Sequence, residues 1–290
     1  MTLSPRLRIA LAALLFSTGG AAIKAADFGA WQVASFRSGV AALTLLLLIP
    51  TAWRGFGWKP LLVGVAYAAT LVSFVLANRL TTSANTIYLQ STAPLYLLLL
   101  GPWLLREPIR RRDLPILLAV LSGLVLVFIG VDTPSTTAPD PARGNLLAVV
   151  SGVSYALMLC GLRWLGRDGD AGGRGIAAVI LGNVIACVTT LPMAFPLGAH
   201  PLGAWGVIAY LGIFQIAGAY LLVTTGIRSV PALEVSLLLL VETACNPVWS
   251  WWLLHEVPSA LALTGGGLII GATILQTLRP AESRPMVAAA

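Results

Sequence analysis

The sequence has few charged residues: Asp, Glu, Lys and Arg make up only 10% of its 290 residues, whereas hydrophobic residues make up 58%. Soluble globular domains carry roughly 25% charged residues. A chain with so few charges cannot cover a soluble surface, which excludes an ordinary soluble domain. Several apolar runs also reach the roughly 20 residues that a helix needs to cross a bilayer. The composition therefore predicts an all-α, multi-pass protein whose surroundings are the lipid bilayer.

Cysteine and histidine are scarce as well. Cys160, Cys187 and Cys245 lie in separate apolar segments without CxxC or Cys/His spacing, which argues against a disulfide framework and a zinc site. The sequence has no Walker A, HExxH or GxSxG motif, and His200 and His255 stand near segment ends. We therefore expect no enzyme activity, no cofactor and no metal. The net charge of +7 sits in short loops, where it indicates membrane topology and not nucleic-acid binding.

Breaks by Gly, Pro and charged residues leave ten apolar segments. They predict helices at approximately 7–24, 29–51, 59–78, 82–104, 113–131, 144–163, 174–195, 202–225, 231–254 and 258–278. The longest connection, "DTPSTTAPDPAR" at 132–143, has the composition of a solvated linker. We therefore expect a first five-helix repeat at 1–134, a linker at 135–143 and a second five-helix repeat at 144–290.

The distribution of Lys and Arg predicts the orientation. With the N-terminus in the cytoplasm, fourteen of the eighteen basic residues fall on the cytoplasmic side and Arg37 falls within a span. Lys24, Arg79 and Arg143 fall on the other side. This asymmetry follows the positive-inside rule and predicts a protein of the plasma (cytoplasmic) membrane with both termini in the cytoplasm. Lys24, at the end of the first helix, is expected to be an interface anchor.

Two long stretches, 81–123 and 230–271, share the same order of sequence features. Each has a polar start, an apolar helix interrupted by Pro, a Glu followed closely by Pro, and a final helix containing Gly. Glu107 of the first stretch thereby corresponds to Glu256 of the second. Because each repeat has five helices, the second would enter the membrane from the opposite side. Inverted repeats are typical of transporters, whose two similar halves can open a central site to either side in turn.

Three segments carry a resemblance to a known family: "LQSTAPLYLLLLGPWLLREPI", "LLLLVETACNPVWSWWLLHEVPS" and "ASFRSGVAALTLLLL". With their order and spacing, the chain resembles the EamA family of the drug/metabolite transporter superfamily from Leu7 to about Leu278. The resemblance implies a ten-helix transporter of two repeats, commonly an exporter of amino acids, aromatic ones included, or of related metabolites. The family often has Glu-Pro in helix nine, whereas this chain has Glu242-Thr243 with Pro247 later.

Helix four carries a stripe of polar and aromatic side chains, formed by Thr81, Asn85, Tyr88, Thr92 and Tyr96. Such groups cannot face lipid cheaply, because hydrocarbon offers no hydrogen-bond partner, so they must face other helices or a watery cavity. Pro94 also leaves the Gln90 carbonyl without its usual donor, near the depth where transporter sites lie on broken helices. Hydrogen bonding between helices and substrate contact both fit the stripe, and cavity lining is favoured for Asn85 and Tyr88.

Two ionisable residues lie within the spans. Inserting a carboxylate such as Glu242 costs at least about 2.5 kcal/mol, so it is usually paired, protonated or in contact with water. Glu242 could couple transport to protons, or it could form a structural pair with Arg37. Arg37 could bind a substrate carboxylate, extend to the interface or hold an acidic partner.

The predicted substrate-binding residues are Phe16, Ser17, Asn85, Tyr88, Thr92, Tyr155, Gln215 and Glu242. Arg37 and Glu242 are the candidates for charge coupling, and Pro94 and Pro247 are the predicted helix kinks. Phe16 and Tyr155 occupy matching places in the two repeats and could frame the cavity as aromatic walls. Ser17 could equally serve close helix packing, which is the commoner role of small residues in membranes.

The leading hypothesis is a secondary transporter that exports a small organic solute, such as an amino acid, by alternating access, with protons as a candidate coupling ion. A carrier of nucleotide sugars or phosphorylated sugars would need several cations inside the bundle, and only Arg37 qualifies. A receptor or assembly subunit without transport would not require inverted symmetry. A monomer and a homodimer both remain open.

Overall fold

The computed structural model describes residues 3–100, 114–130, 133–166, 171–226, 230 and 232–278. In the first half of the chain, two spans consist of two helices each. The elements are α1 (Pro5–Ser17) with α2 (Gly19–Ala25), α3 (Ala30–Leu48), the short 3₁₀ turn η1 (Pro50–Gly55), α4 (Trp58–Leu80), α5 (Ser83–Gln90) with α6 (Ala93–Leu100), and α7 (Leu114–Ile129). They account for spans one to five.

The second half supplies five more spans. They are α8 (Pro141–Gly166), α9 (Ala171–Thr190) with the 3₁₀ turn η4 (Leu191–Ala194), the composite of α10 (Leu202–Tyr210), π-helix η5 (Leu211–Gly218) and α11 (Ala219–Gly226), then α12 (Ala232–Leu254) and α13 (Ala260–Leu278). The expected all-α architecture of ten helices is confirmed, and within the described residues the predicted ends lie within three residues of the observed ones except at the end of the seventh helix. The predicted end of the fourth helix, at 104, lies outside the described residues. By length and apolar composition, six of the described helical segments are sufficient to cross a membrane.

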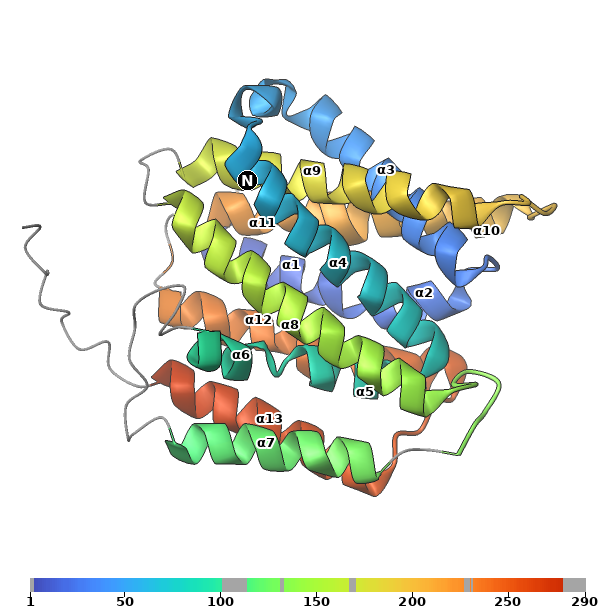
Figure 1. Ribbon diagram of the computed structural model, residues 1–290, viewed down its shortest axis with the longest axis vertical. Helices are drawn as coiled ribbons and strands as arrows, with labels where there is room; N and C mark the ends of the chain where they lie inside the picture. The colour runs from blue at the N-terminus through green and yellow to red at the C-terminus, as the bar shows by residue number, and fades with distance from the viewer. Residues whose placement is uncertain are drawn as a thin grey trace, which may run out of the picture.

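The two halves of the chain are interleaved and share their cores. Helix α4 packs on α8 and α9, α1 packs on α12, and α7 and α13 form a pair along one edge of the bundle (Figure 1). One hydrophobic cluster joins Ile23 and Val120 of the first half to Ile208 and Ile269 of the second. A site between the halves is therefore held by elements far apart in the sequence.

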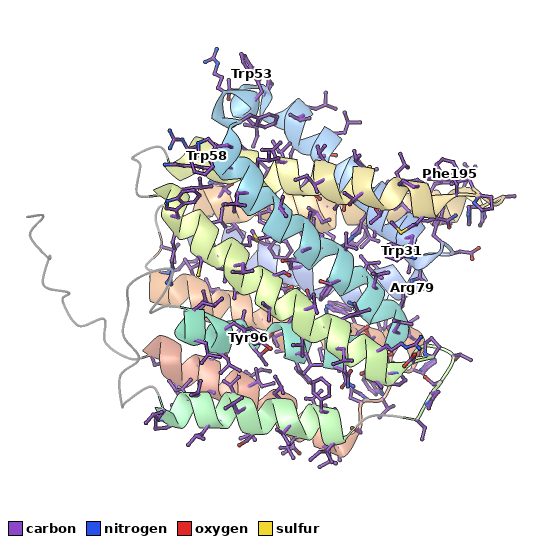
Figure 2. The ribbon with its side chains drawn as sticks, viewed as in Figure 1. Trp31, Trp53, Trp58, Arg79, Tyr96 and Phe195 are labelled. Carbon is purple, nitrogen blue, oxygen red and sulfur yellow. The ribbon has the colours of Figure 1, made fainter. Side chains whose placement is uncertain are left out.

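Aromatic side chains mark both ends of the bundle. Trp53 and Trp58 lie at one end, whereas Trp31 and Phe195 lie at the other (Figure 2). Trp53 and Phe195 are each 60% exposed. Aromatic residues at both membrane interfaces are typical of multi-pass proteins, since an amphipathic ring suits the boundary between lipid and water. The long axes of the spans therefore run between these two ends.

The α7–α13 pair depends on glycine at its crossing point. A methyl group added to Gly265 would lie 2.5 Å from the Gly123 carbonyl oxygen, and one added to Gly123 would lie 2.6 Å from the Gly265 carbonyl oxygen. Small residues allow backbones to approach this closely, which is a common basis of helix association in membranes.

We expect Gly265→Ala to destabilise the protein by roughly 1–3 kcal/mol, because the added methyl forces the two backbones apart. Gly267→Ala is the matched control, since nothing lies within 4 Å of a methyl at that position of the same helix. Thermal unfolding of both variants in detergent measures the difference. Equal melting temperatures for the two variants would show that the crossing is not packed as described.

Candidate functional site

The fourth span is interrupted near its middle. Helix α5 ends at Gln90 and α6 begins at Ala93, just before Pro94. The Thr92 hydroxyl donates to the Leu89 carbonyl at 2.6 Å. Across the gap, a methyl added to Gly152 of α8 would lie 2.9 Å from the Leu89 carbonyl oxygen. Glycine lets the two backbones approach here, because any side chain would push against the interrupted segment.

Polar side chains connect the interruption to three other helices. Gln90 Nε2 donates to Ser151 Oγ on α8 at 2.8 Å, and Ser151 Oγ donates to the Thr70 carbonyl on α4 at 3.2 Å. The hydroxyls of Ser91 and Thr243, the latter on α12, are 3.0 Å apart. Hydrogen-bonding groups thus gather where an interrupted helix meets α4, α8 and α12. Transporter sites are commonly built at broken helices of this kind.

Glu242 directly precedes Thr243 and faces the interior. Protein surrounds its carboxylate, and the residue as a whole has intermediate exposure. No residue in the described ranges gives it a hydrogen bond or an ion pair. Arg37 instead donates to the Leu71 carbonyl at 3.1 Å, is 1% exposed and has Tyr67 as its electrostatic neighbour. The predicted alternative of a structural Glu242–Arg37 pair is therefore wrong.

Aromatic rings of α1, α4 and α11 contact one another, and one of them, Tyr220, lies within electrostatic range of this carboxylate. The Tyr220 ring on α11 contacts Phe16 on α1 edge-on at a centroid distance of 5.3 Å, and Tyr67 on α4 at 5.6 Å. Tyr155 on α8 and Tyr220 lie within electrostatic range of Glu242. Phe16 and Tyr155 were predicted to frame the cavity as aromatic walls; the Phe16 ring contacts Tyr220, and the role of the two residues as cavity walls stays a prediction. Tyr67 was missed, because one Tyr in the apolar run "GVAYAAT" gives no sign of facing the centre.

The other predicted residues of helix four lie in tighter surroundings. The ring of Tyr88 is 6% exposed and packs on Gly266 of α13, where an added methyl would overlap its carbon atoms. The structure thus packs Tyr88 against α13, and its cavity lining stays a prediction. Asn85 is fully buried, with Nδ2 3.4 Å from Thr81 Oγ1, and its own Oδ1 has no hydrogen-bond partner among the described residues. Thr92 is fully buried too.

Ser17 and Gln215 lie at the short break in the first span between α1 and α2. Trp249 Nε1 donates to Ser17 Oγ at 2.9 Å, so this Trp is tied to the first span instead of standing in an aromatic belt. Gln215, on the π-helix, donates to the Phe16 carbonyl at 3.5 Å, and its Oε1 has no partner in the part of the chain that the structure describes. A π-helix within a span often marks a functional position. The predicted kink at Pro247 lies in a helix that runs on without interruption from Ala232 to Leu254.

A largely apolar cavity of about 450 Å³ adjoins this region. Its lining residues are Thr18, Ala22, Ala25, Gly203, Gly206, Val207, Tyr210, Trp249, Trp252 and Leu253. The hydroxyls of Thr18 and Tyr210 are 2.8 Å apart within it. The cavity shares the first span with Ser17 and Phe16 but does not include Glu242. Among the described residues, no group of three or more His, Cys, Asp or Glu side chains could hold a metal ion.

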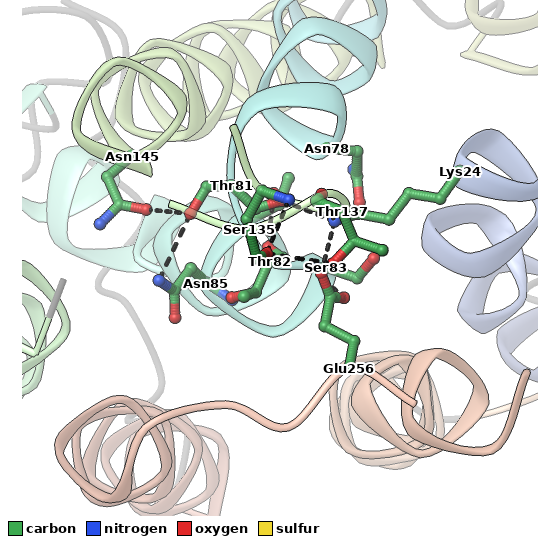
Figure 3. A network of polar contacts seen from close by, with 12 residues as sticks. Lys24, Asn78, Thr81, Thr82, Ser83, Asn85, Ser135, Thr137, Asn145 and Glu256 are labelled. Carbon is green, nitrogen blue, oxygen red and sulfur yellow. Dashed lines mark hydrogen bonds and ion pairs between the residues drawn. The ribbon is translucent and has the colours of Figure 1, made fainter. Parts of the chain in front are cut away.

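A buried ion pair lies at one end of the bundle. Lys24 Nζ lies 2.5 Å from Glu256 Oε1, and the two side chains are 4% and 3% exposed. Lys24 Nζ also donates to the carbonyls of Thr81 at 2.8 Å and Thr137 at 2.5 Å, while the Ser83 N–H donates to Glu256 Oε2 at 2.9 Å (Figure 3). We call these five residues the Lys24–Glu256 cluster. It joins the ends of the first, fourth and ninth spans to the segment before α8.

The backbone at the start of α5 stabilises the carboxylate of the Lys24–Glu256 cluster. Ser83 is the first residue of α5, and a carboxylate at a helix N-terminus is stabilised by the helix dipole and free N–H groups. Breaking a buried pair by removing one partner typically costs 3–5 kcal/mol, because an uncompensated charge remains. The expectation that Lys24 anchors at the interface is wrong. Glu256 served only as a marker of the repeat, and no feature of one sequence indicates that the two residues meet.

Two segments of the chain, residues 6–129 and 142–278, match the EamA-like transporter family. They cover nearly all of the described spans. The chain is a member of the EamA-like transporter family. It is thus a multi-pass secondary transporter that binds small solutes, and it is not an enzyme, as the sequence predicted.

Individual EamA-family relatives support this assignment. The pseudopaline exporter CntI of Pseudomonas aeruginosa (strain UCBPP-PA14) is 26% identical over 272 residues, covering 91% of this chain and 92% of CntI. The uncharacterized transporter YyaM of Bacillus subtilis (strain 168) is 23% identical over 167 residues, covering 57% of this chain and 54% of YyaM. A solved crystal structure shares the fold with a TM-score of 0.64 at 16% identity, covering 94% of this chain and 96% of that chain.

Proposed function

We propose that this EamA transporter exports a small amino-acid-derived solute across the plasma (cytoplasmic) membrane by alternating access, with both termini in the cytoplasm. The main supporting observation is the unpaired Glu242 carboxylate beside the interrupted fourth span. A charge that is costly to bury persists in a membrane when it serves a solute or ion pathway. The relative named as a pseudopaline exporter, which aligns over nearly its full length, supports export.

In this proposal the solute occupies the space bordered by Glu242, Tyr155, Tyr220, Phe16 and the Gln90–Ser151 contact. These groups come from α12, α8, α11, α1 and α5. Because they belong to both halves of the chain, a rocking motion of one half against the other changes their spacing. The proposed halves are residues 1–134 and 144–290, joined by the linker at 135–143.

The Lys24–Glu256 cluster has the role of a gate in this cycle. Under the proposed orientation it lies at the non-cytoplasmic end, which it closes with an ion pair that is almost fully buried. With this ion pair intact, the proposed site would accept solute from the cytoplasm. Release on the other side would require Lys24 and Ser83 to part from Glu256, so that water reaches both charges. Glu242 would bind a proton during the return step, with protons as the coupling ion.

A carrier of nucleotide sugars or sugar phosphates is less well supported. Such substrates need cations at the site, and the spans offer few in the described ranges. The Arg37 guanidinium is held against the Leu71 carbonyl, and Lys24 is held by Glu256. Neither group is free to bind a phosphate without giving up a buried contact.

Counterflow in liposomes tests the proposed function. Purified protein is reconstituted into vesicles loaded with one unlabelled amino acid at a time, and uptake of the same labelled amino acid is followed. We expect transient accumulation above that of protein-free vesicles for at least one amino acid or amino-acid derivative. Absence of exchange for every amino acid and amino-acid derivative tested would contradict the proposal.

A further inference from the structure

We infer that the end of the bundle around Trp58 and Trp164 binds an anionic phospholipid, with the phosphate among basic side chains and the acyl chains against exposed aromatic rings. This surface is formed by Trp53, Arg54, Trp58, Lys59, Arg163 and Trp164, and we call it the Trp58–Trp164 patch. None of its residues belongs to the proposed solute site. The inference therefore does not depend on what the protein transports.

Two tryptophan rings of the patch join segments from the two halves of the chain. Trp58 is the first residue of α4 and Trp164 lies in the last turn of α8, and their ring centroids are 5.6 Å apart at an interplanar angle of 63°. Lys59 Nζ lies 5.9 Å from the Trp58 centroid and 5.1 Å from the Trp164 centroid. A cation within about 6 Å of an aromatic centroid is attracted by the ring quadrupole. The rings therefore position this ammonium group at the end of the bundle.

Two exposed arginines add positive charge to the patch. Arg54 lies in the last turn of η1, shortly before Trp58, and its guanidinium is 5.8 Å from the centroid of the Trp53 ring. Arg163 directly precedes Trp164 at the end of α8. The elements that carry the patch, which are η1, α4 and α8, contain no Asp or Glu in their sequences. The charge of these elements is therefore complementary to an anion.

The exposed rings indicate that the anion is part of a lipid. Trp53 and Trp58 are 60% and 67% exposed, and Phe56 between them is 42% exposed. The two tryptophans mark one end of the bundle, where amphipathic rings suit the boundary between lipid and water (Figure 2). A phospholipid at this boundary brings its phosphate to the cations and its acyl chains to the rings. A soluble phosphate would contact only the cations.

The arrangement goes beyond what the positive-inside rule requires. That rule concerns how many basic residues lie near the ends of the spans, and it does not require that one be held against rings from two helices. Under the proposed orientation the patch lies at the cytoplasmic end. Basic pockets between membrane helices on that side bind anionic head groups, and each basic residue near the surface strengthens the attraction about fivefold.

Native mass spectrometry of the full-length protein in detergent tests the inference. The probes are dioleoylphosphatidylglycerol, which is anionic, and dioleoylphosphatidylcholine, which has the same acyl chains and no net charge. We expect the anionic lipid to bind at least about tenfold more tightly than the neutral one. Glycerol phosphate, which has the phosphate without the acyl chains, should show no binding at the same concentrations.

Single substitutions test whether the patch is the binding site. Arg54→Gln and Arg163→Gln should each weaken binding of dioleoylphosphatidylglycerol about fivefold. Arg143→Gln is the matched control and should leave binding unchanged, since it removes one charge about 30 Å away at the other end of α8. Trp58→Leu should weaken binding several-fold, because it removes a ring that positions Lys59. Melting temperatures of the lipid-free variants establish that each is folded.

Equal affinity for the two lipids would overturn the inference, as would an equal loss of binding in Arg143→Gln. Unchanged binding in both arginine variants or in Trp58→Leu would show that diffuse charge attracts the lipid, and would overturn it too. Binding of glycerol phosphate as tight as that of the lipid would assign the patch to a soluble anion instead. Absence of counterflow with lipid binding intact would contradict the proposed function and leave this inference in place.

Discussion

Glu256→Gln is expected to open the closed end of the bundle. The substitution leaves Lys24 without its counter-charge, and breaking a buried pair in this way costs about 3–5 kcal/mol. A conformation in which Lys24 reaches water is then favoured. The reporter is Ser83→Cys, placed beneath the ion pair at a fully buried position, with Cys160, Cys187 and Cys245 replaced. A membrane-impermeant maleimide should label this cysteine at least about tenfold faster in the Glu256→Gln background, since 1.4 kcal/mol already corresponds to a factor of ten.

The same end of the bundle offers a matched control. Arg143 and Asp140 form an ion pair at 3.2 Å, but their side chains are 81% and 35% exposed. Such surface pairs contribute about 0–1 kcal/mol, so Arg143→Gln should leave the labelling of Ser83→Cys unchanged. If Ser83→Cys is labelled at the same rate with Glu256→Gln, with Arg143→Gln and without either substitution, the Lys24–Glu256 pair does not hold this end closed.

Glu242→Gln is expected to abolish uptake driven by a pH gradient. Glutamine has nearly the same shape as glutamate but cannot bind and release a proton, so it cannot exchange a proton for the solute. Removing a buried charge without a partner should leave the melting temperature unchanged or raise it. Proteoliposomes with an imposed pH gradient and a solute identified by counterflow measure the effect.

Glu242→Asp is the comparison for this experiment, because it keeps the carboxylate and should retain part of the uptake. Uptake by Glu242→Gln with the pH dependence of the unmodified protein would assign this residue to structure. We expect the Glu242→Gln protein to stay folded. If it loses uptake because it unfolds, Glu242 is needed for structure, and this result would also contradict its proposed role in proton coupling.

Much of the fold follows from local features of the sequence. Apolar length sets the number of spans, and the gap before Pro94 follows from the missing proline N–H and the ring's clash with the preceding turn. Pro247 shows the limit of this rule, since α12 continues through it.

The site was predictable only in part. The position of Glu242 in an apolar run marked it as unusual, and that signal is local. The partner of Lys24 lies 232 residues away, so the ion pair depends on how the halves are placed together. The angular position of Tyr88 on its helix was likewise insufficient to predict what its ring contacts, because the ring packs on Gly266 of the last helix.

Cysteine accessibility tests most directly whether two five-helix units run in opposite directions through the membrane. Single cysteines are placed at Val257, which is 70% exposed and follows the ion pair, and at Glu107, which lies outside the described residues. Labelling with an impermeant reagent is compared in intact cells and in inverted vesicles. The account predicts that residue 257 reacts only from the non-cytoplasmic side and residue 107 only from the cytoplasmic side; reaction of both from the same side would contradict it.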